Sequence, residues 1–237
     1  MKLRYGLDAP LVPIMFIGVG IITLVNLDFN HQYVGSIISL IFGLSMLTSG
    51  MIFIHTSLWG KLAIWQTILS KLKINGNEKV LDLGCGSGAV LILFAKLLTK
   101  GGSADGVDLW LSRDQSNNSA AKTQTNIDYN HVGDRTTLIT ADMADLPVHD
   151  HDYDYVVSSY AFHNIKPASK RDQALKEAVR VLKPGGRLII VDMENKFKEY
   201  KSILEQNGLS NVVVTRTGIN GWWGGPWMGS FVISGTK

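Results

Sequence analysis

Charged residues are nearly absent from the first quarter of the chain. Two uncharged runs, of 19 residues over 9–27 and 32 residues over 29–60, fill most of this region. Its charged residues are Lys2, Arg4, Asp8 and Asp28. A helix needs about 20 predominantly apolar residues to cross a bilayer. The two runs therefore predict two transmembrane helices, joined as an antiparallel hairpin by the short polar segment 28–31.

Basic residues flank the two apolar runs and do not occur between them. Lys2 and Arg4 precede the first run, and Lys61, Lys71 and Lys73 follow the second. The positive-inside rule then places both termini and the remainder of the chain in the cytoplasm, which predicts an integral membrane protein. Two alternatives stay open, a cleaved signal peptide, which leaves the second run unexplained, and a pair of buried core helices.

A stripe of large apolar residues at helical spacing follows the second run. Its members are Leu58, Leu62, Trp65, Leu69 and Leu72. The stripe predicts an amphipathic linker helix over 57–74 that lies along the membrane surface. The predicted organisation is thus a transmembrane hairpin over 1–56, this linker, and a domain over 75–237 held against the bilayer.

Short β-rich runs alternate with helical stretches in the predicted domain. Strands are expected over 80–83, 104–108, 136–140, 155–159 and 187–191, with helices over 89–98, 116–129 and 169–182 between them. This alternation predicts an α/β fold with a mostly parallel sheet and helices on both faces. Two further strands are expected over 212–217 and 230–235. Ligands of such sheets bind beyond the carboxyl ends of the strands.

The charge and cysteine content exclude several classes of function. The net charge is +3 and its basic residues are scattered, which predicts no nucleic-acid partner. Cys85 is the single cysteine, so an intramolecular disulfide is impossible and no cysteine-rich metal site is expected.

A β-rich run leads into a glycine loop that opens a predicted helix. Gly84, Gly86 and Gly88 permit positive φ angles and bring backbone N–H groups close to a ligand. The loop alone is weak evidence, since such a turn can serve packing only. Gly84, Gly86 and Ala89 also satisfy the dinucleotide fingerprint, and Asp108 stands where a ribose-binding acid is expected. A nicotinamide-dependent oxidoreductase therefore remains an alternative.

Acidic residues near the loop help to distinguish the possible ligands. Asp82 would repel a pyrophosphate but attract the ammonium of an amino-acid moiety. After the third expected strand, Asp142 can accept a hydrogen bond from an adenine amino group, and Met143 can cover the ring. A helix stop and turn over 182–188 leads into the next strand.

With these three motifs, residues 75–195 resemble the class I S-adenosylmethionine-dependent methyltransferases. The resemblance implies S-adenosylmethionine as the cofactor and a Rossmann-like sheet of seven strands whose last strand is antiparallel. The implied contacts are Gly84, Gly86 and Gly88 along the methionine part, Asp82 at its ammonium, Asp108 at the ribose, Leu109, Asp142 and Met143 at the adenine, and Ser159 at the sheet edge. An aspartate at position 108, where glutamate is usual, is a mild departure.

The acceptor side of such an enzyme has no universal catalytic residue, because the sulfonium is already activated and the protein mainly aligns the nucleophile. The segment after the fourth strand places Tyr160 or His163 near the methyl group. His163 is the preferred base, since its ordinary pKa is near neutrality, although it can instead cap the following loop. The candidate substrate residues are Trp110, Asp114 and Asn118 in a polar segment that could cover the pocket, and Trp222 and Trp223 in a glycine-rich loop.

Each of these substrate assignments has a structural alternative. Asp114 can cap the next helix, and the tryptophans can plug the terminal strands instead of lining an acceptor pocket. The leading hypothesis is a membrane-anchored methyltransferase whose acceptor is a lipophilic small molecule or a lipid. A membrane-tethered sensor or assembly factor that binds the cofactor without turnover is the alternative from another class.

Overall fold

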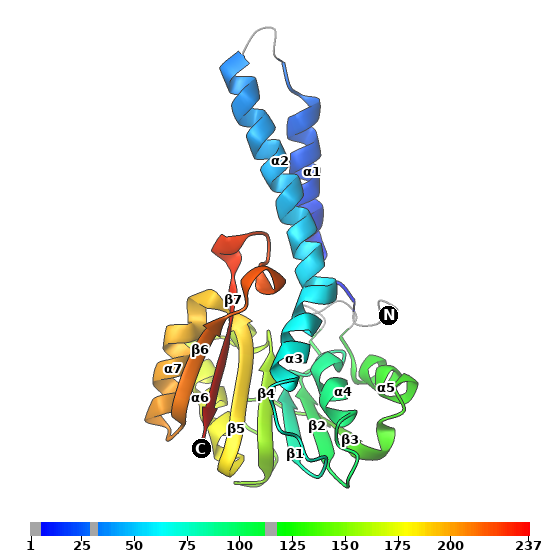
Figure 1. The fold of residues 1–237 in the computed structure, drawn as a ribbon, viewed down its shortest axis with the longest axis vertical. Helices are drawn as coiled ribbons and strands as arrows, with labels where there is room; N and C mark the ends of the chain where they lie inside the picture. Colours follow the sequence, from blue (N-terminus) through cyan, green and yellow to red (C-terminus); the bar gives the residue numbers. More distant parts are fainter. Residues whose placement is uncertain (1–5, 29–32, 112–117) are drawn as a thin grey trace.

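A seven-stranded sheet forms the centre of the domain. The structure is a computed structural model that describes residues 6–28, 33–111 and 118–237. The strand order is β3-β2-β1-β4-β5-β7-β6, and β7 runs antiparallel to both of its neighbours (Figure 1). The strands are β1 (Lys79–Leu83), β2 (Ser103–Asp108), β3 (Thr136–Thr140), β4 (Tyr153–Ser159), β5 (Leu182–Met193), β6 (Ser210–Arg216) and β7 (Ser230–Thr236). The predicted mixed sheet of seven strands is confirmed.

Helices cover both faces of the sheet. One face carries α3 (Lys61–Leu69), α4 (Ala89–Ala95) and α5 (Ala120–Tyr129), and the other carries α6 (Ala168–Arg180) and α7 (Phe197–Gln206). The short helices are η1 (Thr56–Gly60), η2 (Gly133–Arg135), η3 (Phe162–Asn164), η4 (Glu194–Lys196), η5 (Gly218–Gly221) and η6 (Pro226–Met228). Helix α7 is absent from the sequence prediction; it buries Tyr200 and Leu204 against the sheet.

Two apolar helices project from the domain side by side (Figure 1). They are α1 (Leu11–Val25) and α2 (Tyr33–His55), which pack against each other. Glycines allow the close approach, because a Cβ atom on Gly20 would lie 2.9 Å from the carbonyl oxygen of Gly43. Such small residues are typical of helix pairs in membranes.

The two apolar helices differ in length. Within the described residues, one helical stretch, Tyr33–Leu69, is long and apolar enough to cross a membrane. Helix α1 is also apolar, but its 15 residues extend only about 22 Å, less than the ~30 Å hydrocarbon core. It is shorter than the uncharged run that predicted it because the helix starts after Pro10 and ends at Asn26.

The predicted surface helix over 57–74 is corrected by the packing of α3. A π-helical turn, η1, joins α2 directly to α3. The apolar stripe of α3 then turns toward the domain, where Trp65 is fully buried and meets the ring of Phe94 edge-on. Helix α3 is amphipathic because one of its faces packs on the domain. The apolar stripe on that face is therefore not available to a lipid surface.

Candidate active site

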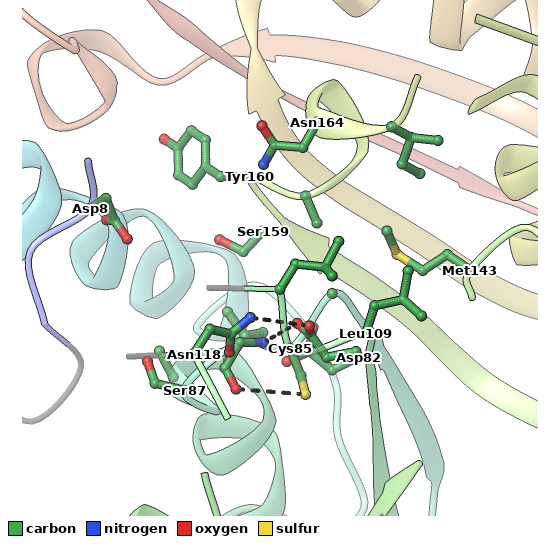
Figure 2. Close-up of a pocket in the computed structure, with 18 of the residues that line it drawn as sticks. Asp8, Asp82, Cys85, Ser87, Leu109, Asn118, Met143, Ser159, Tyr160 and Asn164 are labelled. Carbon is green, nitrogen blue, oxygen red and sulfur yellow. Dashed lines mark hydrogen bonds between the residues drawn. The ribbon is translucent and has the colours of Figure 1, made fainter. Parts of the chain in front are cut away.

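A cavity of about 200 Å³ lies at the carboxyl ends of the central strands. Its wall is formed by the glycine loop after β1, by the segments after β2, β3 and β4, by α3, and by the segment before α1. Residues predicted from the sequence that line it are Asp82, Gly84, Gly86, Asp108, Leu109, Asn118, Asp142, Met143, Ser159 and Tyr160. The cavity therefore brings together most of the predicted cofactor site (Figure 2).

Some predicted residues do not border this cavity. Among the described residues these are Gly88, Trp110, His163, Trp222 and Trp223. Asp114 lies outside the described residues. Gly88 directly precedes α4 and has a φ of 81°.

The glycine loop is a turn that side chains would obstruct. Gly84 and Gly86 have φ angles of 69° and 49°, in the left-handed region that favours glycine. A Cβ atom on Gly84 would also overlap the Cβ of Ala161, which follows β4. The turn therefore depends on glycine both for its backbone conformation and for the close approach of the next strand's loop.

Asp82 is a buried carboxylate at the cavity wall with one oxygen left unpaired. It is 1% exposed, its Oδ2 accepts a hydrogen bond from the backbone N–H of Leu91 at 2.9 Å, and its Oδ1 has no partner among the described residues. Burial raises the pKa of Asp82 to about 7; the Leu91 amide opposes this rise and the charge of Asp108 adds to it. A cationic donor would satisfy Oδ1 and favour ionisation. The site thus fits the ammonium of S-adenosylmethionine better than a pyrophosphate.

Asp108 ends β2 and organises the neighbouring loops. Its Oδ2 accepts from the backbone N–H of Gly86 at 2.8 Å, and its Oδ1 accepts from the N–H of Trp110 at 2.6 Å and from Nδ2 of Asn118 at 3.2 Å. A carboxylate offers about four acceptor positions, so one remains. The Oδ1 of Asn118 is buried and has no partner among the described residues. These two acceptors fit ribose hydroxyls, and Asn118 lies with Asp108 on the predicted cofactor side.

Asp142 and Met143 follow β3, and the sulfur of Met143 would lie 3.6 Å from a Cβ atom on Gly84 of the glycine loop. Asp142 pairs with Nζ of Lys170 at 2.5 Å and accepts from the N–H of Ala144 at 3.0 Å. Burial acts to raise its pKa, but the contacts with Lys170 and Ala144 outweigh this, so the pKa is lowered and Asp142 is ionised at neutral pH. Leu109 and Met143 lie on the same side of the cavity (Figure 2). Two apolar side chains beside an ionised acceptor fit an adenine ring and its amino group.

Tyr160 follows β4 and faces both the cavity and the C-terminal loop. Its hydroxyl donates to Oγ of Ser230 at 3.0 Å. Burial raises the pKa of Tyr160 far above its ordinary value, and the charges of Asp192 and Asp8 add to the rise. The phenol therefore stays protonated at neutral pH and is a positioning donor rather than a base. The neighbouring Ser159 accepts from Nε1 of Trp65 at 2.9 Å, which ties the end of β4 to α3.

The sequence predicts His163 as the preferred base near the methyl group. The structure places His163 outside the lining of the cavity. In η3, its Nδ1 lies 2.6 Å from Oδ1 of Asp192, and its backbone N–H donates to Oδ2 of the same residue at 3.0 Å. Asp192 is fully buried and also accepts from the hydroxyl of Tyr200. His163 is thus paired with this buried carboxylate and does not line the cavity.

Trp223 of the C-terminal loop is a packing residue. Trp223 is 6% exposed and packs edge-on against Phe53 of α2 and against Tyr160. The carbonyl oxygen of Trp222 accepts a hydrogen bond from the Thr56 hydroxyl. The loop thus packs between α2 and the domain. Trp110 also lies off the cavity, with its Nε1 donating to Thr140 Oγ1 at 2.8 Å.

The cavity also contains residues that sequence reasoning missed. Asp8 and Lys61 form a salt bridge of 2.6 Å, and Trp65 and Asn164 also line the cavity. Asp8 directly precedes the first uncharged run and Lys61 directly follows the second, and both positions are visible in the sequence. Their pairing across 53 positions is not visible there. Lys170, at the start of α6, has no local signal that points to Asp142.

Comparison with known proteins supports the resemblance. Residues 81–190 match the family described as "Methyltransferase domain". Sterol 4-C-methyltransferase strm-1 of Caenorhabditis elegans is 31% identical over 53% of this chain and 34% of its own length. The chloroplastic 2-phytyl-1,4-beta-naphthoquinone methyltransferase of Arabidopsis thaliana is 30% identical over 65% of this chain and 57% of its own length. The demethylmenaquinone methyltransferase of Lactiplantibacillus plantarum is 32% identical over 52% and 48%. The chain thus spans at most about three fifths of these relatives.

Solved structures share the fold. A SAM dependent methyltransferase from Aquifex aeolicus aligns with a TM-score of 0.56 at 18% identity, over 73% of this chain and 88% of that one. Geranyl diphosphate methyltransferase in complex with SAM aligns with a TM-score of 0.58 at 15% identity, over 80% and 90%. The family match over residues 81–190, the strand order and the donor set of the cavity agree, and this part of the chain is similar to S-adenosylmethionine-dependent methyltransferases.

Proposed function

We propose that this protein is a membrane-anchored methyltransferase that moves a methyl group from S-adenosylmethionine to a lipophilic small molecule or lipid at the cytoplasmic face of the membrane. One observation carries the proposal. The cavity lined by Asp82 and Asp108 is also lined by Asp8, just before α1, and by Lys61, just after η1. A molecule dissolved in the bilayer around α1 and α2 would therefore reach the cofactor from the foot of these helices.

The surface of the two helices supports a lipid environment. Outward-facing apolar side chains are exposed along both of them, among them Leu11, Ile14, Met15, Ile22, Val25, Ile38, Ile41 and Met51. Exposed apolar surface on this scale is costly in water and favourable in lipid. Trp59 and Trp227 are exposed near the foot of the helices, where tryptophan favours the headgroup layer.

The named relatives support a lipophilic acceptor. Their names state a sterol and quinone-type molecules as what they methylate or produce. The excess of basic residues at both ends of the apolar region supports the cytoplasmic placement of the domain.

Different residues of the cavity would bind different parts of S-adenosylmethionine. S-adenosylmethionine supplies an activated methyl group when bound. Asp82 would hold its ammonium, Asp108 and Asn118 its ribose, and Asp142 its adenine amino group; the unpaired oxygens of Asp82 and Asn118 are two of these acceptors. The protein's contribution is then to align the acceptor and exclude water. Because Tyr160 stays protonated, it orients a group and does not remove a proton from it.

Radiolabelled methyl transfer into a total membrane extract tests the proposal. The full chain in detergent, supplied with methyl-labelled S-adenosylmethionine, is expected to place label in the organic phase. Label only in water-soluble compounds would contradict a lipophilic acceptor. Tight cofactor binding without transfer to any fraction would favour a sensor, and calorimetry that detects NAD(H) but not S-adenosylmethionine would favour an oxidoreductase.

A further inference from the structure

Lys61 places a buried ammonium group in the cavity wall. Its side chain is 11% exposed, and its Nζ lies 2.6 Å from Oδ2 of Asp8. The same oxygen accepts from the hydroxyl of Ser57 at 3.0 Å. The pair stands where the chain passes between the apolar helices and the domain, with Asp8 just before α1 and Lys61 just after η1.

The ammonium keeps unused hydrogen-bonding capacity. A lysine ammonium has three donors, and Asp8 is the one described residue that accepts from Nζ. Burying a charged group is costly unless its hydrogen bonds are completed. A bound oxygen atom in the cavity would complete them.

Apolar and aromatic side chains also line the cavity that holds Lys61. Among them are Leu62, Trp65 and Val90. Figure 2 shows Asp8, Tyr160 and Asn164 around one part of the cavity, and Asp82, Cys85 and Asn118 around another part. Asp8, the partner of Lys61, therefore lies on a different side of the cavity from Asp82 and Cys85.

We propose that Lys61, held by Asp8, recognises the polar head of the methyl acceptor through a hydroxyl or carbonyl oxygen carried by an otherwise apolar molecule. This inference rests on the proposed function, since it needs an acceptor in this cavity. The Lys61 ammonium, in a cavity that apolar side chains also line, favours a ring or chain with an oxygen at its head over a plain hydrocarbon of the same shape. Lys61 is thus a specificity-determining residue.

The test compares two probes that differ by one oxygen. Radiolabelled para-dodecylphenol and dodecylbenzene are bound to the full chain loaded with S-adenosylhomocysteine in detergent micelles. In the natural protein, the phenol is expected to bind at least about tenfold more tightly, in keeping with a hydrogen bond to a charged group. Equal binding of the two probes would overturn the inference.

Variants show whether Lys61 causes the preference. Lys61→Met alone removes the ammonium that pairs with Asp8 and leaves the carboxylate charge, so the double variant Asp8→Asn with Lys61→Met removes both charges together. Lys71→Met is the matched control, because Lys71 is exposed and does not line the cavity. The double variant is expected to bind both probes within about twofold of each other, while the control keeps the preference of about tenfold.

The possible outcomes separate the two proposals. A preference for the phenol that persists in the double variant would overturn the role of Lys61. If the double variant does not bind S-adenosylhomocysteine, the comparison of the two probes on the natural protein and on Lys61→Gln decides. Failure of the proposed function appears separately, as absence of label in every lipid fraction while the phenol preference remains measurable.

Discussion

The two ends of the cavity leave opposite hydrogen-bonding groups unsatisfied. Near Asp82 and Asn118 the unpaired groups among the described residues are acceptor oxygens, whereas near α1 and α2 they are N–H donors of Lys61. The first end requires a ligand rich in donors, such as an ammonium and hydroxyl groups. The second requires an acceptor oxygen. One cavity can therefore orient two different molecules, because each end rejects the polar groups of the other's ligand.

The two ends also differ in how the chain builds them. The cofactor end consists of short segments that directly follow β1, β2 and β3, so their positions are set by the sheet. The other end is formed by Asp8 and α3, which reach the cavity from the apolar helices. Substitutions at the first end should affect cofactor binding, and substitutions at the second should affect acceptor choice.

The largest effect is expected at the glycine loop. Gly84→Ala introduces a Cβ that overlaps Ala161 in a left-handed backbone, and it should weaken S-adenosylmethionine binding by at least about a hundredfold. Calorimetry measures this. Gly101→Ala is the matched control, because Gly101 has a φ of 84° but no atom within 4 Å of the added Cβ. If both variants bind alike, the close approach of Gly84 to Ala161 has no role.

Asp108→Ala should weaken cofactor binding by about tenfold to a hundredfold. The change removes the acceptor of three hydrogen bonds, from Gly86, Trp110 and Asn118, and the position offered to a ribose hydroxyl. Equilibrium dialysis with labelled cofactor measures the loss. Asp134→Ala, on an exposed turn, should bind as the natural protein does. An unchanged affinity of Asp108→Ala would remove this residue from the cofactor site.

The pH dependence of binding should follow Asp82. Its pKa is raised to about 7 in the folded protein, so folding stability without cofactor is full below the ordinary pKa of about 4 and is lost as pH rises through about 7. A cationic ligand prefers the ionised form. Cofactor affinity should therefore rise about fivefold from about pH 6 to about pH 7.

Asp82→Asn is the control for this pH effect, because the amide does not titrate. The variant should show a flat affinity over the same interval and a smaller loss of stability with rising pH, measured by denaturant titration. An equally steep profile in the variant would assign the titration to another group.

The smallest effect on turnover is expected at His163. His163→Gln should lower the free energy of unfolding by about 1–3 kcal/mol, because the buried Asp192 loses a partner. Methyl transfer should stay within about threefold of the natural protein. A loss of about a hundredfold or more is what removal of a general base produces, and it would restore the catalytic role predicted from the sequence.

The parts of the site that sequence reasoning predicted are those set by local chain geometry. β-Rich runs followed by glycine or acidic residues predict which side chains gather at the sheet edge, and Asp82, Gly84, Asp108 and Met143 do so. The predicted strand over 136–140 coincides with β3.

The parts that were missed depend on contacts between distant segments. His163 follows the same strand end as Tyr160, but it pairs with Asp192, 29 positions later, and does not line the cavity. The stripe of α3 has the amphipathic spacing of a surface helix, and only packing on Phe94 shows which surface it covers. The pairing of Asp8 with Lys61 likewise appears only in the fold.

The claim that the acceptor reaches the cavity from the bilayer has a direct test. The full chain is reconstituted into vesicles made from a membrane extract and mixed with protein-free vesicles of the same extract, and labelled S-adenosylmethionine is added outside. The proposal predicts label in the lipid phase of the vesicles that contain the protein and little in the others. Equal labelling of both populations, or label confined to the aqueous phase, would contradict it.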